Sequence, residues 1–196
     1  MLVLNFVQQP CQMQQGQTRK EKHMLRSGLK NLVQGASCGV AMAVLAAGAV
    51  QAEQSALAEV EAVSGAFYAA LNEMLAGSPI SQDVAPLWLD AEGVTALHPV
   101  GGRDIGLGTL VAAFDGVASL ASGGEVALQD QAIAVFGETA VETGVEIGSA
   151  TLAGEVITLE YRVTNVYTLS DEGWRMVHHH TDLSTPIIEL LARLSD

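Results

Sequence analysis

The spacing of the apolar residues changes at Gly123-Gly124, and this change restricts the fold more than any other feature of the chain. Before these glycines, apolar residues recur every three or four positions, as on one face of a helix. After them, four segments alternate polar residues with Val, Ile or Tyr, as expected of strands with two unlike faces. Helices followed by a run of long strands predict an α+β domain.

Three helices and one strand are predicted before the change. Residues 55–76 form the first helix, which ends at Gly77-Ser78-Pro79. A short helix is predicted over 81–90, a strand over 93–102 and a longer helix over 104–122. The first helix carries an apolar face made of Leu57, Val60, Val63, Phe67, Leu71 and Met74.

Four antiparallel strands and a last helix are predicted after the change. The strands cover residues 125–137, 139–150, 155–169 and 173–183, and the helix covers 185–194. The helices are expected to pack on one face of a curved sheet. The sequence contains no internal repeat, no phosphate-binding loop and no dinucleotide-binding glycine pattern.

The first 52 residues differ in composition from the rest. Residues 24–52 have a basic start, an apolar run and small residues at the end, which predicts a secretory signal cleaved after Ala52. A buried helix or an uncleaved anchor is the alternative. Residues 1–23 are interpreted as an upstream extension or a start-site artefact. The domain proper is then 53–196, which we expect to be exported to the periplasm or secreted, and free of the membrane after cleavage.

The predicted mature chain is strongly acidic. Residues 53–196 hold four arginines, no lysine and 21 acidic residues, which gives a formal charge of −17. Such a charge repels nucleic acid and anionic membranes, so neither is expected as a partner. Both cysteines, Cys11 and Cys38, precede Ala52, so the exported domain folds without a disulfide.

The order of elements and three phrases resemble the nuclear transport factor 2-like superfamily, in particular its SnoaL-like branch. The phrases are "FYAALNEMLAG", "VTALHPVGGRDIG" and "YRVTNVYTLSDEGWRMVHHHTD", and the last is also similar to the association domain of calcium/calmodulin-dependent kinases. The similarity covers about residues 55–194. It implies a cone-like curved antiparallel sheet with helices packed on its concave face and a pocket between the first helix and the sheet. It also implies a homodimer formed through the convex face.

One of these phrases can be compared with ketosteroid isomerases position by position. "TALHPVGG" resembles the segment in which an aspartate before Pro-Val-Gly is the general base, and this position is His98 here. The isomerase tyrosine matches Phe67, with Tyr68 expected to point elsewhere, and its protonated aspartate falls near Thr164 or Asn165. All three positions differ, so a standard isomerase is not expected. His98 still qualifies as a base because imidazole titrates near neutral pH.

Three consecutive histidines near the C-terminus raise the question of a metal. In a regular strand, His178 and His180 share one face with Trp174 and Met176, which we assign to the convex side. A histidine pair at this spacing suits zinc or copper only with a third ligand, and neither His98 nor Asp182 is brought there by the sequence. We therefore predict no metal site and no cofactor.

Further candidates for the pocket are polar. The kinase-domain resemblance places His179 and Thr181 toward it, although a bulge at Gly173 would change the register. The positions of that domain's anion-binding arginines match Asn165 and Thr181, so anion binding is not carried over. Tyr161 is expected to orient a substrate and Arg103 to lie at the pocket mouth. Asp104, next to Arg103, is predicted to cap the following helix.

Three functions remain open. The first is a non-enzymatic domain that binds a small, mainly apolar molecule against walls such as Phe67, Leu71 and Val163. The second is a cofactor-free isomerase, cyclase or dehydratase with His98 as general base. The third is a dimeric scaffold. His98 and His179 on one enclosed cavity would favour the enzyme, and a purely apolar cavity would favour the binding domain.

Overall fold

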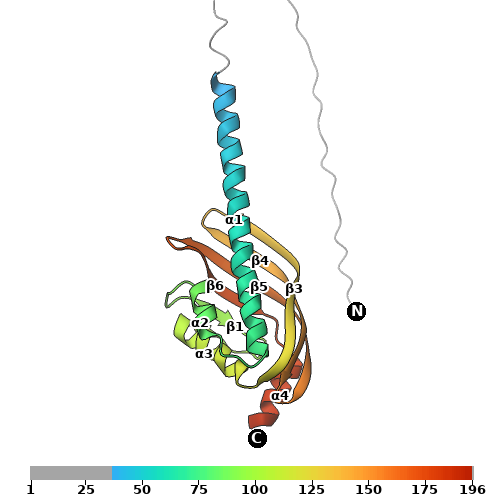
Figure 1. Cartoon of the computed structure of the whole chain (residues 1–196). Coiled ribbons are helices and arrows are strands. Elements are labelled where there is room, and N and C mark those ends of the chain that lie inside the picture. The colour runs from blue at the N-terminus through green and yellow to red at the C-terminus, as the bar shows by residue number, and fades with distance from the viewer. Residues whose placement is uncertain (1–36, 196) are drawn as a thin grey trace, which may run out of the picture. The chain divides into compact units, whose positions relative to one another are not determined.

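The C-terminal half of a long helix, α1 (Ser37–Leu75), runs across one face of a curved six-stranded sheet (Figure 1). The computed structural model describes the backbone of residues 37–195 and the side chains of residues 50–195. Met42–Asp196 form one compact unit. The predicted extension 1–23 and the start of the predicted signal lie outside the described residues. The helix passes through Ala52 without a break, and cleavage there remains a prediction.

Two of the other helices are shorter than predicted. The segment 81–90 forms α2 (Ser81–Val84) and a 3-10 turn, η1 (Ala85–Leu87), because Pro86 ends the regular helix. The helix predicted over 104–122 is α3 (Leu107–Ala118), and its first residues instead form strand β2 (Asp104–Ile105). The C-terminal helix α4 (Thr185–Ser195) lies where it was predicted.

Four long strands confirm the alternating pattern that follows the glycines. They are β3 (Ala121–Phe136), β4 (Thr139–Leu152), β5 (Glu155–Ser170) and β6 (Gly173–Thr181), each paired antiparallel with its neighbour in sequence. The sheet order is β2-β1-β6-β5-β4-β3. The short strand β1 (Thr95–Leu97) pairs with β6 in the parallel direction, which the expectation of an all-antiparallel sheet missed.

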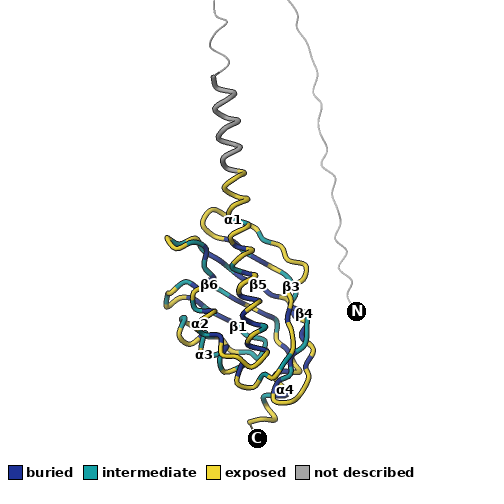
Figure 2. The backbone as a smooth tube through the Cα atoms, in the orientation of Figure 1, coloured by how far each residue is buried: buried dark blue, intermediate teal, exposed yellow. Residues whose placement is uncertain are grey.

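The inner face of β4 carries unexpected residues. Glu142 and Glu146 are buried, whereas Val141, Val145 and Ile147 on the opposite face are only half-buried. Figure 2 shows the buried residues gathered where α1 and the strands face each other. The core is therefore formed mainly by α1, α3 and the inner face of β5, and the valines of β4 face outward.

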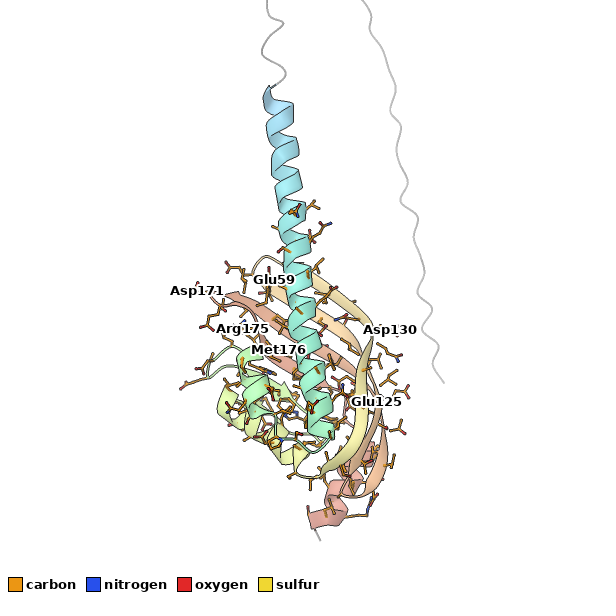
Figure 3. All side chains as sticks on the ribbon, in the orientation of Figure 1. Glu59, Glu125, Asp130, Asp171, Arg175 and Met176 are labelled. Atoms are coloured by element: carbon orange, nitrogen blue, oxygen red, sulfur yellow. The ribbon has the colours of Figure 1, made fainter. Side chains whose placement is uncertain are left out.

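The face predicted for Trp174 and Met176 of β6 was wrong, whereas His178 and His180 lie on the side away from the helices, as predicted. Trp174 and Met176 are buried, as are His179 and Thr181, although Met176 and His179 are three positions apart and would face opposite sides of a regular strand (Figure 3 labels Met176). The cause is a bulge: Tyr167 pairs with Met176 and the preceding Val166 pairs with His178, so Val177 is an extra residue. A bulge reverses the faces of all residues beyond it. It lies at Val177, not at Gly173.

The outside of the domain carries most of its acidic residues. Glu59, Glu125, Asp130 and Asp171 are all exposed and are labelled in Figure 3. Two arginines pair with carboxylates there: Arg162 with Asp182, and Arg193 with Glu155. Such exposed pairs are screened by solvent and contribute little to stability. Among the described residues, no helix is both long and apolar enough to cross a membrane.

Candidate functional site

A cavity of about 340 Å³ lies between α1, α3, α4 and the inner face of the sheet. Most of its lining is apolar, and the walls include Leu71, Met74, Phe114, Leu159 and Ile187. A few polar side chains interrupt this surface: His98, Asp104, Glu146, Tyr161 and His179. An apolar cavity of this size with a small number of convergent polar groups is typical of a site for a small organic molecule.

A hairpin places His98 and Asp104 side by side. Strands β1 and β2 pair antiparallel, and the turn between them begins with a hydrogen bond from the Gly101 amide to the His98 carbonyl. Gly101 and Gly102 have φ angles of 88° and 80°, a left-handed conformation that glycine adopts without strain. The chain therefore reverses its direction between His98 and Asp104, which are six positions apart. As a result, Nε2 of His98 donates to Oδ2 of Asp104 at 2.8 Å.

This pairing corrects the role predicted for Asp104. The residue that precedes the first turn of α3 is Gly106, and no side chain caps that helix. The Asp104 carboxylate instead fixes the imidazole of His98 with its proton on Nε2, which leaves Nδ1 as the basic nitrogen. The edge of the ring packs against Phe114 at a centroid distance of 5.3 Å.

His179 reaches the same cavity because β1 and β6 are neighbours. Ala96 pairs with His179 in the parallel ladder, so His98, two residues further along the chain, lies on the same inner face. The two imidazole rings are 6.4 Å apart between centroids. One small substrate can therefore contact both rings.

A buried network fixes the proton of His179. The Glu142 carboxylate accepts hydrogen bonds from Asn165 Nδ2, Tyr167 and Gln131 at 2.7, 2.6 and 2.6 Å. Because Asn165 donates to Glu142, its amide oxygen is left to accept from Nδ1 of His179 at 2.7 Å. His179 therefore carries its proton on Nδ1, and Nε2 remains an acceptor.

Burial also keeps His179 neutral. Loss of solvent lowers the pKa of His179 to about 3, and the positive charge that His98 can carry acts in the same direction. Within residues 50–195, Trp88 Nε1 is the one buried side-chain nitrogen or oxygen without a partner. Nε2 of His179 is not such an atom, so it keeps contact with the cavity as a neutral acceptor.

Glu146 is a second titratable group that the sequence analysis missed. Its Oε1 accepts a hydrogen bond from the Tyr68 hydroxyl at 2.9 Å, although Tyr68 was expected to point elsewhere. Burial raises the pKa of Glu146 to about 7, the Tyr68 bond lowers it, and the nearby Glu142 charge raises it. No local pattern marks this residue, because Glu142 and Glu146 alternate with valines as on a strand whose charged face meets solvent.

The structure brings together four of the predicted site residues. His98, Tyr161, His179 and Arg103 line the cavity, and Arg103 is exposed at its mouth. Three others do not line it. Phe67 is fully buried against His179 and Phe114, Asn165 lies behind His179, and Thr181 is directed toward the Leu97 carbonyl. Of the expected apolar walls, Leu71 lines the cavity, whereas Phe67 and Val163 do not.

His178 and His180 lie on the opposite side of β6. Nδ1 of His178 is 2.7 Å from Oγ1 of Thr95. The centroids of the His178 and His180 rings are 6.0 Å apart. Burial lowers the pKa of His178, and the neighbouring His180 acts in the same direction. In the part of the chain that the structure describes, no group of three or more His, Cys, Asp or Glu side chains is arranged to hold a metal ion.

The fold has many solved counterparts. A candidate dehydratase of the NTF2-like family from Streptomyces avermitilis is 22% identical, with a TM-score of 0.59 over 68% of this chain and 99% of that one. A candidate calcium/calmodulin-dependent kinase II association domain from Thiobacillus denitrificans is 22% identical, with a TM-score of 0.53 over 64% and 94% of the two chains. A candidate scytalone dehydratase from Novosphingobium aromaticivorans is 11% identical, with a TM-score of 0.56 over 66% and 84%.

These likenesses concern the fold, and the family follows from the sequence. No protein of curated function matches the chain. The model of the SnoaL-like domain matches residues 60–187, which include α1 from Val60, the whole sheet and the start of α4. That range covers well over half of the chain and every residue that lines the cavity except Leu191. The chain therefore belongs to the SnoaL-like domain family, as the phrases in its sequence predicted.

Proposed function

We propose that this protein is a cofactor-free enzyme that transfers protons on a small, mainly apolar substrate, with His98 as general base. The observation that carries the proposal is the pair of His98 and Asp104 in an apolar cavity, with neutral His179 beside it. The carboxylate holds the imidazole in one tautomer and stabilises the charge that forms when Nδ1 takes a proton. A domain that only binds an apolar molecule has no need of this pair.

The polar groups suggest which substrates fit. Nδ1 of His98 can remove a proton from a carbon made acidic by an adjacent carbonyl group. Nε2 of His179 can only accept a hydrogen bond, so it suits a substrate hydroxyl or N–H. An apolar molecule that carries both a carbonyl and a hydroxyl group meets these conditions. Isomerisation and dehydration are the reactions expected of it, and the related fold named for a dehydratase agrees with this class.

A reporter of base catalysis tests the proposal without knowledge of the natural substrate. 5-Nitrobenzisoxazole is a flat apolar molecule whose ring opens to a coloured phenolate when a base removes one C–H proton. We expect the protein to open it with saturation kinetics, at a rate above that of free imidazole at equal concentration. The apolar phenol 2-naphthol should inhibit competitively, because it fits the same cavity.

The other outcomes separate the remaining hypotheses. Binding of 2-naphthol without ring opening would favour a non-enzymatic binding domain. If the protein neither binds 2-naphthol nor opens the ring, the dimeric scaffold is the remaining hypothesis. Ring opening that is not inhibited by 2-naphthol would place the reaction outside the cavity and contradict the proposal.

We also propose export and dimerisation, for which different residues argue. The segment 24–52 has the pattern of a cleaved signal, and Val141, Val145 and Ile147 leave a half-buried apolar face on β4. Such a face suits a second copy of the chain. Native mass spectrometry of protein purified from an exporting host should show a dimer of chains that begin at Glu53. A monomer at micromolar concentration would contradict dimerisation. A chain that retains Met24 would contradict cleavage of the signal.

A further inference from the structure

We propose that Glu146 is the proton donor of this site, and that it protonates the substrate oxygen while His98 removes the carbon-bound proton. This inference rests on the proposed function and adds a second catalytic group to it. Neither the resemblance to known families nor the predicted pocket residues included Glu146. Its position, its partners and the charges around it support this role.

The position of Glu146 gives it access to a substrate. It lies on the inner face of β4 opposite Tyr161 of β5, and both side chains line the cavity that also contains His98. Its side chain is almost fully buried. Oε1 accepts from Tyr68, while Oε2 is not among the buried atoms that lack a partner, so Oε2 keeps contact with the cavity.

The surroundings of Glu146 favour its protonated form near neutral pH. Among the side chains of residues 50–195, no cation pairs with it: α1 presents the Tyr68 hydroxyl, β5 presents Tyr161, and Leu128 lies opposite on β3. Glu142, on the same strand, adds a negative charge. Burial together with that charge raises the pKa of Glu146 to about 7, so the carboxyl group holds a proton that it can give up.

The proposed step can be written for a ketone. Nδ1 of His98 takes a proton from the carbon next to the carbonyl, and the C–H electron pair forms a carbon–carbon double bond. The carbonyl π electrons move to the oxygen, which takes the proton from Oε2 of Glu146. The products are an enol, a protonated His98 and a Glu146 carboxylate. In the reverse step, His98 returns a proton to the carbon and the enol oxygen returns its proton to Glu146. Both side chains are then restored.

The exchange of deuterium into 2-tetralone tests this step, because enolisation of a ketone depends on help at its oxygen. In D₂O, proton NMR should show exchange at the carbons next to the carbonyl, with a pH profile whose alkaline limb falls through about 7, where Glu146 loses its proton. Glu146→Gln keeps the acceptor for Tyr68 but has no acidic proton, and it should exchange about 100-fold more slowly. Glu160→Gln, on the exposed face of β5, is the matched control and should behave as the parent.

Tyr68→Phe adds a measurement that a structural role of Glu146 would not affect. The Tyr68 hydrogen bond lowers the pKa of Glu146, so its loss should move the fall in rate to higher pH. Carbon-13 NMR of the glutamate side chains should show one carboxyl group that titrates near pH 7, absent from Glu146→Gln and shifted upward in Tyr68→Phe.

The outcomes separate this inference from the proposed function. If the protein opens 5-nitrobenzisoxazole while Glu146→Gln exchanges 2-tetralone at the parental rate, Glu146 is not the donor and His98 remains the base. Exchange confined to other carbons, no exchange at all, or a Glu146 carboxyl that titrates with the surface glutamates would also overturn the inference. If the parent does not open 5-nitrobenzisoxazole, the proposed function itself fails.

Discussion

Replacement of His98 by alanine is expected to lower kcat/KM for the opening of 5-nitrobenzisoxazole about 100- to 10,000-fold, the contribution usual for general-base catalysis. The reason is that His98 is the one group in the cavity with a basic nitrogen and a carboxylate that supports its charge. His179 is too weak a base to replace it, because burial lowers its pKa to about 3. The measurement is a steady-state rate followed by the absorbance of the phenolate.

The matched control for this variant is His180→Ala. His180 lies on the exposed face of the same sheet and does not line the cavity, so its loss should leave kcat/KM unchanged. Asp104→Asn should lower kcat/KM by less than His98→Ala, since the base remains but loses its support. A His98→Ala protein that keeps its fold by circular dichroism and turns over normally would falsify the assignment of the base.

Replacement of Glu142 by alanine is expected to lower the free energy of unfolding by about 2–4 kcal/mol, because each buried donor that loses its acceptor costs about 1–3 kcal/mol. Glu142 is fully buried and accepts hydrogen bonds from Gln131, Asn165 and Tyr167. Alanine leaves three donors without an acceptor and a void between α1 and the sheet. Urea denaturation followed by tryptophan fluorescence measures the change.

Glu160→Ala is the control for the stability prediction. Glu160 lies on β5 with an exposed side chain, so the same deletion there should change the free energy of unfolding by about 0.5 kcal/mol or less. An equal fall in the free energy of unfolding for the two variants would mean that the buried network contributes nothing beyond strand propensity. Glu142→Ala should also weaken the hydrogen bond between Asn165 and His179, because Asn165 would lose the partner that orients its amide.

Much of the fold could be predicted from local patterns. The alternation over 125–137, 139–150, 155–169 and 173–183 located all four long strands, and the end of α1 falls one residue before the predicted end at position 76. These features depend on neighbours in sequence: side-chain period, glycine turns and the proline that stops a helix. The family resemblance supplied the sheet's curvature and the side on which the helices pack.

The site was predictable only in part. His98, His179, Tyr161 and Arg103 line one cavity as expected. Asp104 was assigned to a helix cap because it precedes a helix, yet it bonds to His98 once the β1–β2 hairpin closes. Glu142 and Glu146 were overlooked because charged residues that alternate with valine normally face solvent.

The sequence by itself determined the first helix, the four long strands and the C-terminal helix, together with the family and the residue types at the candidate site. Tertiary structure decided which of those residues meet. A single extra residue at Val177 turns His179 inward and His178 outward, and the parallel pairing of β1 with β6 places His98 next to His179. The buried glutamates of β4 depend on donors from α1, β3 and β5. Contacts between distant segments leave no local pattern, so no periodicity in the sequence records them.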